Sequence, residues 1–286
     1  MGPDHWGEQY NTCDGKFQSP INIDDLKVVK KSFKPLIMKG FNVAATSAEV
    51  FNNGHTVLAN LKFAETPTIE SGPLDGKGVY KFSQFHFHWG DNDTIGSEDR
   101  INNIAYPAEL HIVFYNERYD SVNEALTFDG GIAVLAFFYK FYMFENHKYI
   151  ELTRLLEQVQ EPNKRASFAN PPMLKDFIHN NLTAYYTYIG SLTTPPCSEE
   201  VIWIDFEQAI QIAPEQLDRF RSLYSHDGLP LKHNFRPIQP LNNRTVYKAM
   251  PTLSPAFKVQ SNNNSASEVT GQHILILLLI YLYTSI

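Results

Sequence analysis

The stretch Gln84-Phe85-His86-Phe87-His88-Trp89-Gly90 alternates polar and aromatic residues. A β-strand sends alternate side chains to opposite faces, so Gln84, His86 and His88 share one face. The aromatic side chains share the other face, which suits a buried core. The stretch therefore predicts a strand with a hydrophobic core on one side and two imidazoles on the other.

A second alternating run, residues 108–113, carries a third imidazole. His111 lies 23 residues after His88, enough for a connection and a return strand. The connection, residues 90–106, is rich in Asp, Asn and Gly, as loops are. Two imidazoles on one strand and a third from its neighbour predict a zinc site with an open fourth position. An open position is typical of catalytic rather than structural zinc.

Two polar side chains are placed to support these imidazoles. Gln84 shares a face with His86, and Glu109 shares a face with His111. Such partners fix the ring orientation and tautomer of a metal-bound histidine. The alternative interpretation is a polar stripe, formed by His86 and His88, on a half-exposed strand. The third histidine in a second strand favours the metal site.

The remaining pattern predicts a mainly β, α+β domain. Apolar runs predict strands at residues 79–89, 110–115, 132–138 and 201–204. Helical spacing of apolar residues predicts helices at 149–160 and 214–224. The 286 residues, 43% of them hydrophobic, are enough for one large core. A net charge of −7 without a basic stripe argues against nucleic acid as a partner.

Further motifs follow one another in a fixed order between residues 4 and 255. They are Gln18-Ser19-Pro20-Ile21-Asn22-Ile23, Asn53-Gly54-His55, Gly96-Ser97-Glu98, Ala108-Glu109-Leu110-His111, Gly190-Ser191-Leu192-Thr193-Thr194-Pro195-Pro196 and Arg236-Pro237-Ile238-Gln239-Pro240-Leu241. With residues 84–90, they resemble an α-class carbonic anhydrase of the secreted or membrane-anchored branch. The resemblance implies a large, twisted, mostly antiparallel central sheet with short peripheral helices. It also implies a zinc enzyme that reversibly hydrates carbon dioxide to bicarbonate and a proton, and that binds sulfonamide inhibitors.

The resemblance assigns roles around the zinc ion. The implied ligands are His86, His88 and His111. Thr193 would accept a hydrogen bond from zinc-bound hydroxide and donate its own proton to Glu98, because one hydroxyl can do both. Thr194 would be a second hydroxyl at the bound anion, and the backbone carbonyl of Asn234 would support a ligand histidine. From the residues alone, residues 193–196 could instead be only a rigid turn.

Substrate and proton also have implied partners. Carbon dioxide is small and apolar, so it needs an apolar wall beside the metal. The matching positions are Val113, Val134, Leu192, Val201 and Trp203. From the residues alone, each of these is an ordinary core side chain. His55 matches the histidine that passes protons to buffer, which suits an imidazole at neutral pH.

Three positions depart from the family pattern. Asp99 stands where relatives usually have a histidine, so the network behind the metal differs. Leu58 replaces a usual Asn or Gln, where an apolar residue could disturb the water between the zinc and His55. The expected tyrosine does not directly follow Gly7; the nearest is Tyr10. No ligand is lost, so we expect an active enzyme that is slower than the fastest members.

The chain has two cysteines, Cys13 and Cys197. By count alone they could be free thiols, but the resemblance implies a disulfide between them, as in secreted and membrane-bound relatives. Closing so long a loop would stabilise the fold by about 5 kcal/mol in the chain-entropy model. Such a bond persists only in an oxidising compartment.

The C-terminal sequence predicts a membrane anchor. Residues 274–286 are almost wholly apolar, but these 13 residues are fewer than the roughly 20 that span a bilayer. No Lys or Arg follows them, and a small and polar stretch precedes them. The pattern predicts a glycosylphosphatidylinositol signal with attachment at residues 263–265, the alternative being a retained short anchor. We therefore expect a catalytic domain at 1–257, a polar stalk at 258–273 and a removed tail at 274–286.

Sequons and the N-terminus extend this prediction of localisation. Of the sequons at Asn92, Asn181, Asn243 and Asn263, we expect the first two to carry glycans. The residues from Asp4 onward resemble the start of a mature domain, so we expect a signal peptide that was removed or is not part of this chain. The expected place is the extracellular face of the plasma membrane.

A rival function from another class is a non-catalytic carbonic-anhydrase-like module that binds an extracellular partner. Such relatives typically lose at least one zinc histidine, whereas this chain keeps all three. A third hypothesis, hydrolysis of another substrate, is disfavoured because the narrow apolar pocket argues against bulky molecules. Carbon dioxide hydration is therefore the leading hypothesis.

Overall fold

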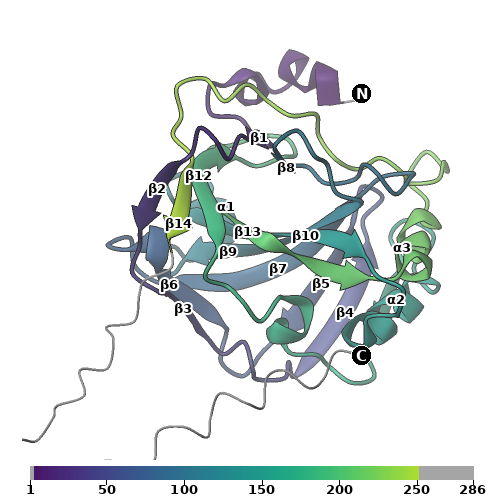
Figure 1. The fold of residues 1–286 in the computed structure, drawn as a ribbon. Helices are drawn as coiled ribbons and strands as arrows, with labels where there is room; N and C mark the ends of the chain where they lie inside the picture. The colour runs from purple at the N-terminus through teal and green to yellow at the C-terminus, as the bar shows by residue number, and fades with distance from the viewer. Residues whose placement is uncertain (1–2, 251–286) are drawn as a thin grey trace, which may run out of the picture. The chain divides into compact units, whose positions relative to one another are not determined.

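The computed structural model describes residues 3–250, whose main feature is a large mixed sheet (Figure 1). Within these residues the sheet has 12 strands, most of them in the order β11, β4, β5, β7, β9, β10, β13, β12, β14 and β2. Strand β6 pairs with β3 and β7. The bounds are β2 (Val29–Ser32), β3 (Leu36–Lys39), β4 (Ser47–Asn52), β5 (Val57–Lys62), β6 (Thr68–Ser71), β7 (Tyr80–Trp89), β9 (Ala108–Asn116), β10 (Ile132–Phe141), β11 (Arg165–Ser167), β12 (Tyr185–Ser191), β13 (Glu199–Ile212) and β14 (Tyr247–Met250).

Neighbouring strands are mostly antiparallel, apart from the parallel pairs β10–β13 and β14–β2. A separate parallel pair joins β1 (Asn22–Ile23) to β8 (Arg100–Ile101). The helices are short: α1 (Val122–Ala125), α2 (Ile150–Leu156), α3 (Pro214–Arg221), and the 3-10 turns η1 (Pro3–Glu8), η2 (Asn11–Asp14), η3 (Gly72–Leu74), η4 (His147–Tyr149) and η5 (Leu174–Phe177). This arrangement confirms the predicted mainly β fold with a large, mostly antiparallel sheet.

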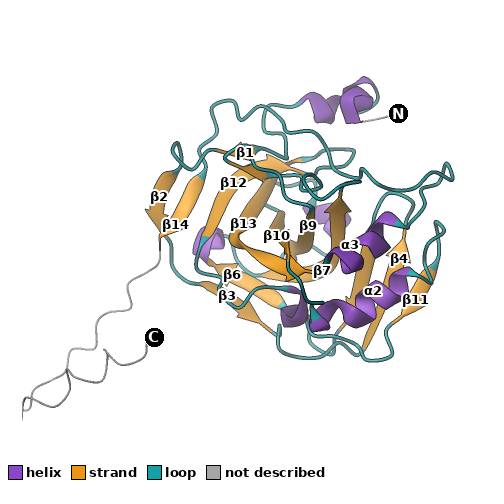
Figure 2. Cartoon of the chain, turned by 45° about the vertical axis from the view of Figure 1, so that its right-hand side comes forward, coloured by secondary structure: helices purple, strands orange, loops and turns teal. Residues whose placement is uncertain are grey.

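The two faces of the sheet bury different side chains. On one face, Phe87 and Trp89 of β7 pack against Phe220 of α3, with ring centroids 4.9 and 5.4 Å apart. Helices α2 and α3 lie side by side over this face (Figure 2). The opposite face holds a smaller apolar cluster that includes Val113, Val134, Ala136, Phe138, Val201 and Trp203. His86, His88 and His111 alternate with the first set, so they share the second face.

Strand β13 is much longer than the sequence pattern predicts. The apolar run ends at Ile204, but the strand continues through Asp205 to Ile212. It is paired with β10 on one side and with β12 on the other, so its backbone groups are satisfied there whatever its side chains are. The helices are shorter than predicted: α2 ends at Leu156 rather than near 160, and α3 at Arg221 rather than near 224.

The two cysteines form the predicted disulfide. Cys13 in η2 is bonded to Cys197, with 4.9 Å between their Cα atoms. No helix within residues 3–250 is both long and apolar enough to cross a bilayer. The predicted stalk and tail, residues 258–286, and the sequon at Asn263 lie outside the described residues.

Candidate metal centre

The pairing of two central strands brings three imidazoles together. In the register of β7 with β9, His86 lies directly opposite His111, and His88 lies opposite Glu109. One nitrogen from each of His86, His88 and His111 lies within 4.8 Å of the others. The ring centroids are 4.5 to 5.3 Å apart. The predicted metal triad is therefore confirmed as a cluster that could hold one ion.

Each ring is held through the nitrogen that faces away from the cluster. Nδ1 of His86 lies 3.0 Å from Oε1 of Gln84. Nδ1 of His88 lies 2.7 Å from the backbone oxygen of Asn234. Nε2 of His111 lies 2.7 Å from Oε1 of Glu109. Because these oxygens accept N–H bonds, the remaining nitrogens, Nε2 of the first two rings and Nδ1 of His111, are left as electron-pair donors.

The surroundings favour the neutral form of two of the imidazoles. Burial lowers the pKa of His86 and His111 well below the ordinary value, and the neighbouring His88 lowers it further. Since only a neutral imidazole binds a metal, this shift favours binding. Three imidazole nitrogens that converge in this way form the donor set of an open-position zinc centre. The residues present therefore fit a zinc ion.

A buried carboxylate completes the polar side of the site. Oε1 of Glu98 accepts the backbone N–H of Arg236 at 2.7 Å. Its Oε2 lies 3.4 Å from Nε2 of His88 but has no partner in full hydrogen-bond geometry among the described residues. Burial raises the pKa of Glu98, while the nearby His88 and the Thr193 hydroxyl lower it in part. Oε2 therefore lies near the imidazoles of His88 and His111 and is left to accept a further hydrogen bond.

The loop that carries Thr193 is tied to the N-terminal segment. Thr193 is buried and the following Thr194 is exposed. The Cys197 disulfide fixes the far side of the loop, and Nε2 of Gln18 donates to the Cys197 carbonyl at 3.2 Å. Arg236 in turn donates to Oε1 of Gln18 at 2.8 Å. The loop therefore has a defined position beside Glu98.

The five predicted wall residues meet on the histidine face. Val134 pairs in register with Val113 on one side and with Trp203 on the other. Val201 belongs to the same apolar cluster, and the half-buried Leu192 packs against it. The Trp203 ring lies 4.8 Å from the His111 ring, between centroids. An apolar surface therefore adjoins the candidate metal position.

The predicted proton-transfer residue lies on the turn between β4 and β5. His55 is exposed, and Leu58 three residues later is paired in register with His86. The hydroxyl of Thr56 donates to the backbone oxygen of Phe87 at 2.5 Å. This turn is therefore hydrogen-bonded to the part of β7 that carries His86 and His88.

Two buried aspartates lie behind the site, one of which the sequence analysis did not single out. Asp99 accepts the backbone N–H of Ile21 at 2.6 Å and the hydroxyl of Tyr188 at 3.2 Å. Burial raises the pKa of Asp99 to about 7. Asp205 is fully buried, and neither of its carboxylate oxygens has a partner among residues 3–250. The only sequence signal for Asp205 is that it ends an apolar run within a strand.

Comparison with known proteins agrees with this geometry. A family model described as eukaryotic-type carbonic anhydrase matches residues 1–250. Human carbonic anhydrase 6 is 36% identical over 263 residues, covering 89% of this chain and 83% of that protein. Human carbonic anhydrase 7 is 37% identical over 255 residues, covering 86% of this chain and 93% of that protein. Mouse carbonic anhydrase 7 matches to the same extent.

Proposed function

Because the chain belongs to the eukaryotic-type carbonic anhydrase family, which is zinc-dependent, we propose that it catalyses the reversible hydration of carbon dioxide to bicarbonate and a proton. The observation that carries this proposal is the cluster of His86, His88 and His111, whose donor nitrogens lie within 4.8 Å of one another. A zinc ion held there supplies a Lewis acid that activates water near neutral pH.

Glu98 and Thr193 orient the attacking oxygen. Oε1 of Glu98 is occupied by the Arg236 backbone N–H, so Oε2 is the oxygen left to accept the Thr193 proton. With its proton directed to Glu98, the Thr193 hydroxyl can only accept from the water-derived nucleophile. Thr194 is exposed next to it and can donate to the product anion. These residues thereby direct a lone pair toward the substrate.

The apolar wall binds carbon dioxide and excludes water from it. Val113, Val134 and Trp203 form a row across three neighbouring strands, next to the His111 ring. Such a surface offers carbon dioxide no hydrogen bonds and holds little water beside it. Leu192 and Val201 extend the wall toward Thr193. An apolar wall of this kind suits a small apolar substrate such as carbon dioxide.

His55 transfers the product proton to buffer. We expect His55→Ala to lower turnover at low buffer concentration and added imidazole to restore it, because free imidazole can take over the transfer. Initial rates of hydration at several buffer concentrations measure this effect. Turnover that stays unchanged in the variant would remove His55 from the mechanism.

Two residues near the site depart from the family pattern, and both lower the rate that we expect. Leu58 faces His86 across the strand pair, and an apolar side chain there cannot hydrogen-bond to water on the way to His55. The Asp99 carboxylate accepts the backbone N–H of Ile21 and the Tyr188 hydroxyl, bonds that a neutral histidine could not make in the same way, so it alters the network behind the site. We therefore propose an active enzyme that is slower than the fastest members of the family.

The rival function, a non-catalytic binding module, is distinguished by the metal. A chain that serves only for binding has no need for three histidines, each held by its own acceptor. We expect one zinc ion per chain and hydration that a sulfonamide inhibits. His111→Ala should lose both zinc and activity, whereas His147→Ala, at an exposed histidine in η4, should keep both. Full activity in His111→Ala would refute the proposed site.

We further propose a secreted, membrane-anchored glycoprotein. The Cys13–Cys197 disulfide supports an oxidising compartment. The sequons at Asn92 and Asn181 are exposed, and in each the Asn Oδ1 accepts the backbone N–H and the hydroxyl of the Thr two residues later. Residues 1–257 would be the catalytic domain and residues 258–286 the anchor signal. Phosphatidylinositol phospholipase C should release the protein from cells; retention after treatment would refute the lipid anchor.

A further inference from the structure

Two exposed histidines from distant parts of the chain lie next to each other. His55 occupies the turn between β4 and β5, and His226 occupies the turn after α3. Their ring centroids are 5.5 Å apart, with the planes at 70°. Within residues 3–250 neither ring is engaged in a hydrogen bond: the contact of His55 with Asn53 uses the backbone N–H. The ring nitrogens of both histidines are therefore open to other partners.

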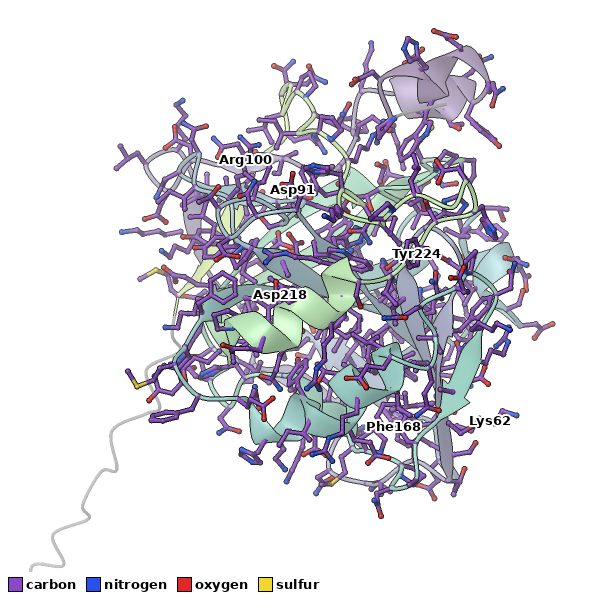
Figure 3. All side chains as sticks on the ribbon, turned by 90° about the vertical axis from the view of Figure 1, so that its right-hand side faces the viewer. Lys62, Asp91, Arg100, Phe168, Asp218 and Tyr224 are labelled. Carbon is purple, nitrogen blue, oxygen red and sulfur yellow. A yellow bond between two sulfur atoms is a disulfide. The ribbon has the colours of Figure 1, made fainter. Side chains whose placement is uncertain are left out.

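The buried side-chain amide of Asn52 hydrogen-bonds to both of these turns. Asn52 is fully buried, and its Oδ1 accepts the backbone N–H of Gly54 at 2.8 Å. Its Nδ2 donates to the backbone oxygen of Tyr224 at 3.1 Å, and also to Val159 and Gln160. Tyr224, labelled in Figure 3, lies two residues before His226. One side chain therefore sets the positions of both histidine-bearing turns.

The His226 ring is also fixed by direct packing. Gly54 has a φ of +77°, and a Cβ atom placed on it would lie 2.3 Å from Cδ2 of His226. The turn that carries His226 is closed by the N–H of Gly228, which donates to the Ser225 carbonyl at 3.0 Å. The exposed imidazole of His226 therefore lies directly against the turn that carries His55.

We propose that His226 is a second proton-transfer residue, which accepts the proton from His55 and passes it to buffer. This inference rests on the proposed carbon dioxide hydration. In the transfer, an N–H bond of the His55 imidazolium breaks and an N–H bond forms on His226. A base of the buffer then removes that proton, which returns both rings to the neutral form. His226 thus extends the export path beyond the turn that bears His55.

Stopped-flow hydration of carbon dioxide by zinc-loaded protein tests this relay, with His226→Ala, His55→Ala, the double variant and the control His147→Ala. We expect His226→Ala to lower kcat by about 3-fold at low buffer, less than the 10²-fold or more of a group that acts on the reacting bond. Because proton export follows the conversion of carbon dioxide, kcat/KM should stay unchanged. Imidazole should restore kcat, and His147→Ala should match the unaltered protein.

The double variant decides whether the two histidines act in series. In a relay, loss of His226 lowers kcat no further once His55 has been replaced, so the double variant should have the kcat of His55→Ala. A further decrease in the double variant would overturn the relay, as would an unchanged kcat in His226→Ala. A fall in kcat/KM together with kcat would also overturn it, because that pattern indicates a structural effect. Absence of hydration in the unaltered zinc-loaded protein would instead refute the proposed function itself.

Discussion

Replacement of Asp205 by asparagine should stabilise the protein, and the gain should grow with pH. The carboxyl group is fully buried in β13, and neither oxygen has a partner among the described residues. Burial raises the pKa of Asp205 well above its ordinary value, and the nearby Asp99 raises it further. Asparagine has nearly the same shape and does not ionise, so the substitution removes the titratable group without opening a cavity.

The sign of the pH dependence follows from where the proton is bound. Between the ordinary carboxyl pKa and the raised one, folded Asp205 keeps a proton that the unfolded chain has released. The free energy of unfolding therefore falls as pH rises through this range and is highest below it. The loss is at most about 1.4 kcal/mol for each pH unit. Asp205→Asn lacks this loss, so its advantage increases with pH between the ordinary carboxyl pKa and the raised one.

The size of the expected stabilisation follows from this pH dependence. An unpaired buried polar group costs about 1–3 kcal/mol, but the asparagine amide is as unpaired here as the carboxyl group, so only the pH-dependent loss separates the two proteins. For a domain of this size, 1 kcal/mol shifts the melting temperature by about 3 °C, so the advantage of Asp205→Asn should grow by at most about 4 °C for each pH unit. Thermal and urea unfolding of zinc-loaded protein, at a series of pH values above the ordinary carboxyl pKa, measures it. The control is Asp120→Asn, at an exposed aspartate, which should change little.

Two results would refute this reasoning. A less stable Asp205→Asn would show that the carboxylate makes a favourable interaction, for example with a bound water or cation. A gain that stays constant over the whole pH series would show that the proton is not retained in the folded state. Either result would mean that Asp205 is not an uncompensated buried acid.

Three further outcomes are expected. Glu109→Gln should weaken zinc binding by about 10- to 100-fold, measured by competition with a chelator, because the amide cannot serve both His111 and the backbone donors; unchanged affinity would contradict this role. Thr193→Val should lower hydration by roughly 100-fold at full zinc content, because the nucleophile loses its orientation; a rate within a factor of two would contradict it. Reduction of the Cys13–Cys197 disulfide should lower the free energy of unfolding by about 2–5 kcal/mol in denaturant titrations, and an unchanged midpoint would contradict that estimate.

The faces of the central strands were predictable from the sequence, but their register was not. Alternation in residues 84–90 places His86 and His88 on one face, because the side-chain period of a strand is two residues. That His86 lies opposite His111 depends on how the connection between the strands folds. The motif resemblance supplied that placement, whereas the alternation alone leaves the register free.

The features that sequence patterns missed depend on tertiary contacts. Asp205 continues a strand that the polarity pattern ends, because backbone pairing on both sides outweighs the cost of the side chain. His226 lies in a turn whose sequence has no periodicity. Its position next to His55 is set by Asn52, which is close to His55 in the sequence but far from His226. Such an arrangement leaves no local pattern to detect.

The most direct test of the account is stopped-flow carbon dioxide hydration by the zinc-loaded protein, with zinc per chain measured on the same sample, with and without a sulfonamide. The account predicts one zinc ion bound by His86, His88 and His111, and hydration that the sulfonamide abolishes. One bound zinc without hydration would contradict the proposed catalysis. Failure to bind zinc would contradict the metal centre and favour the binding-module function.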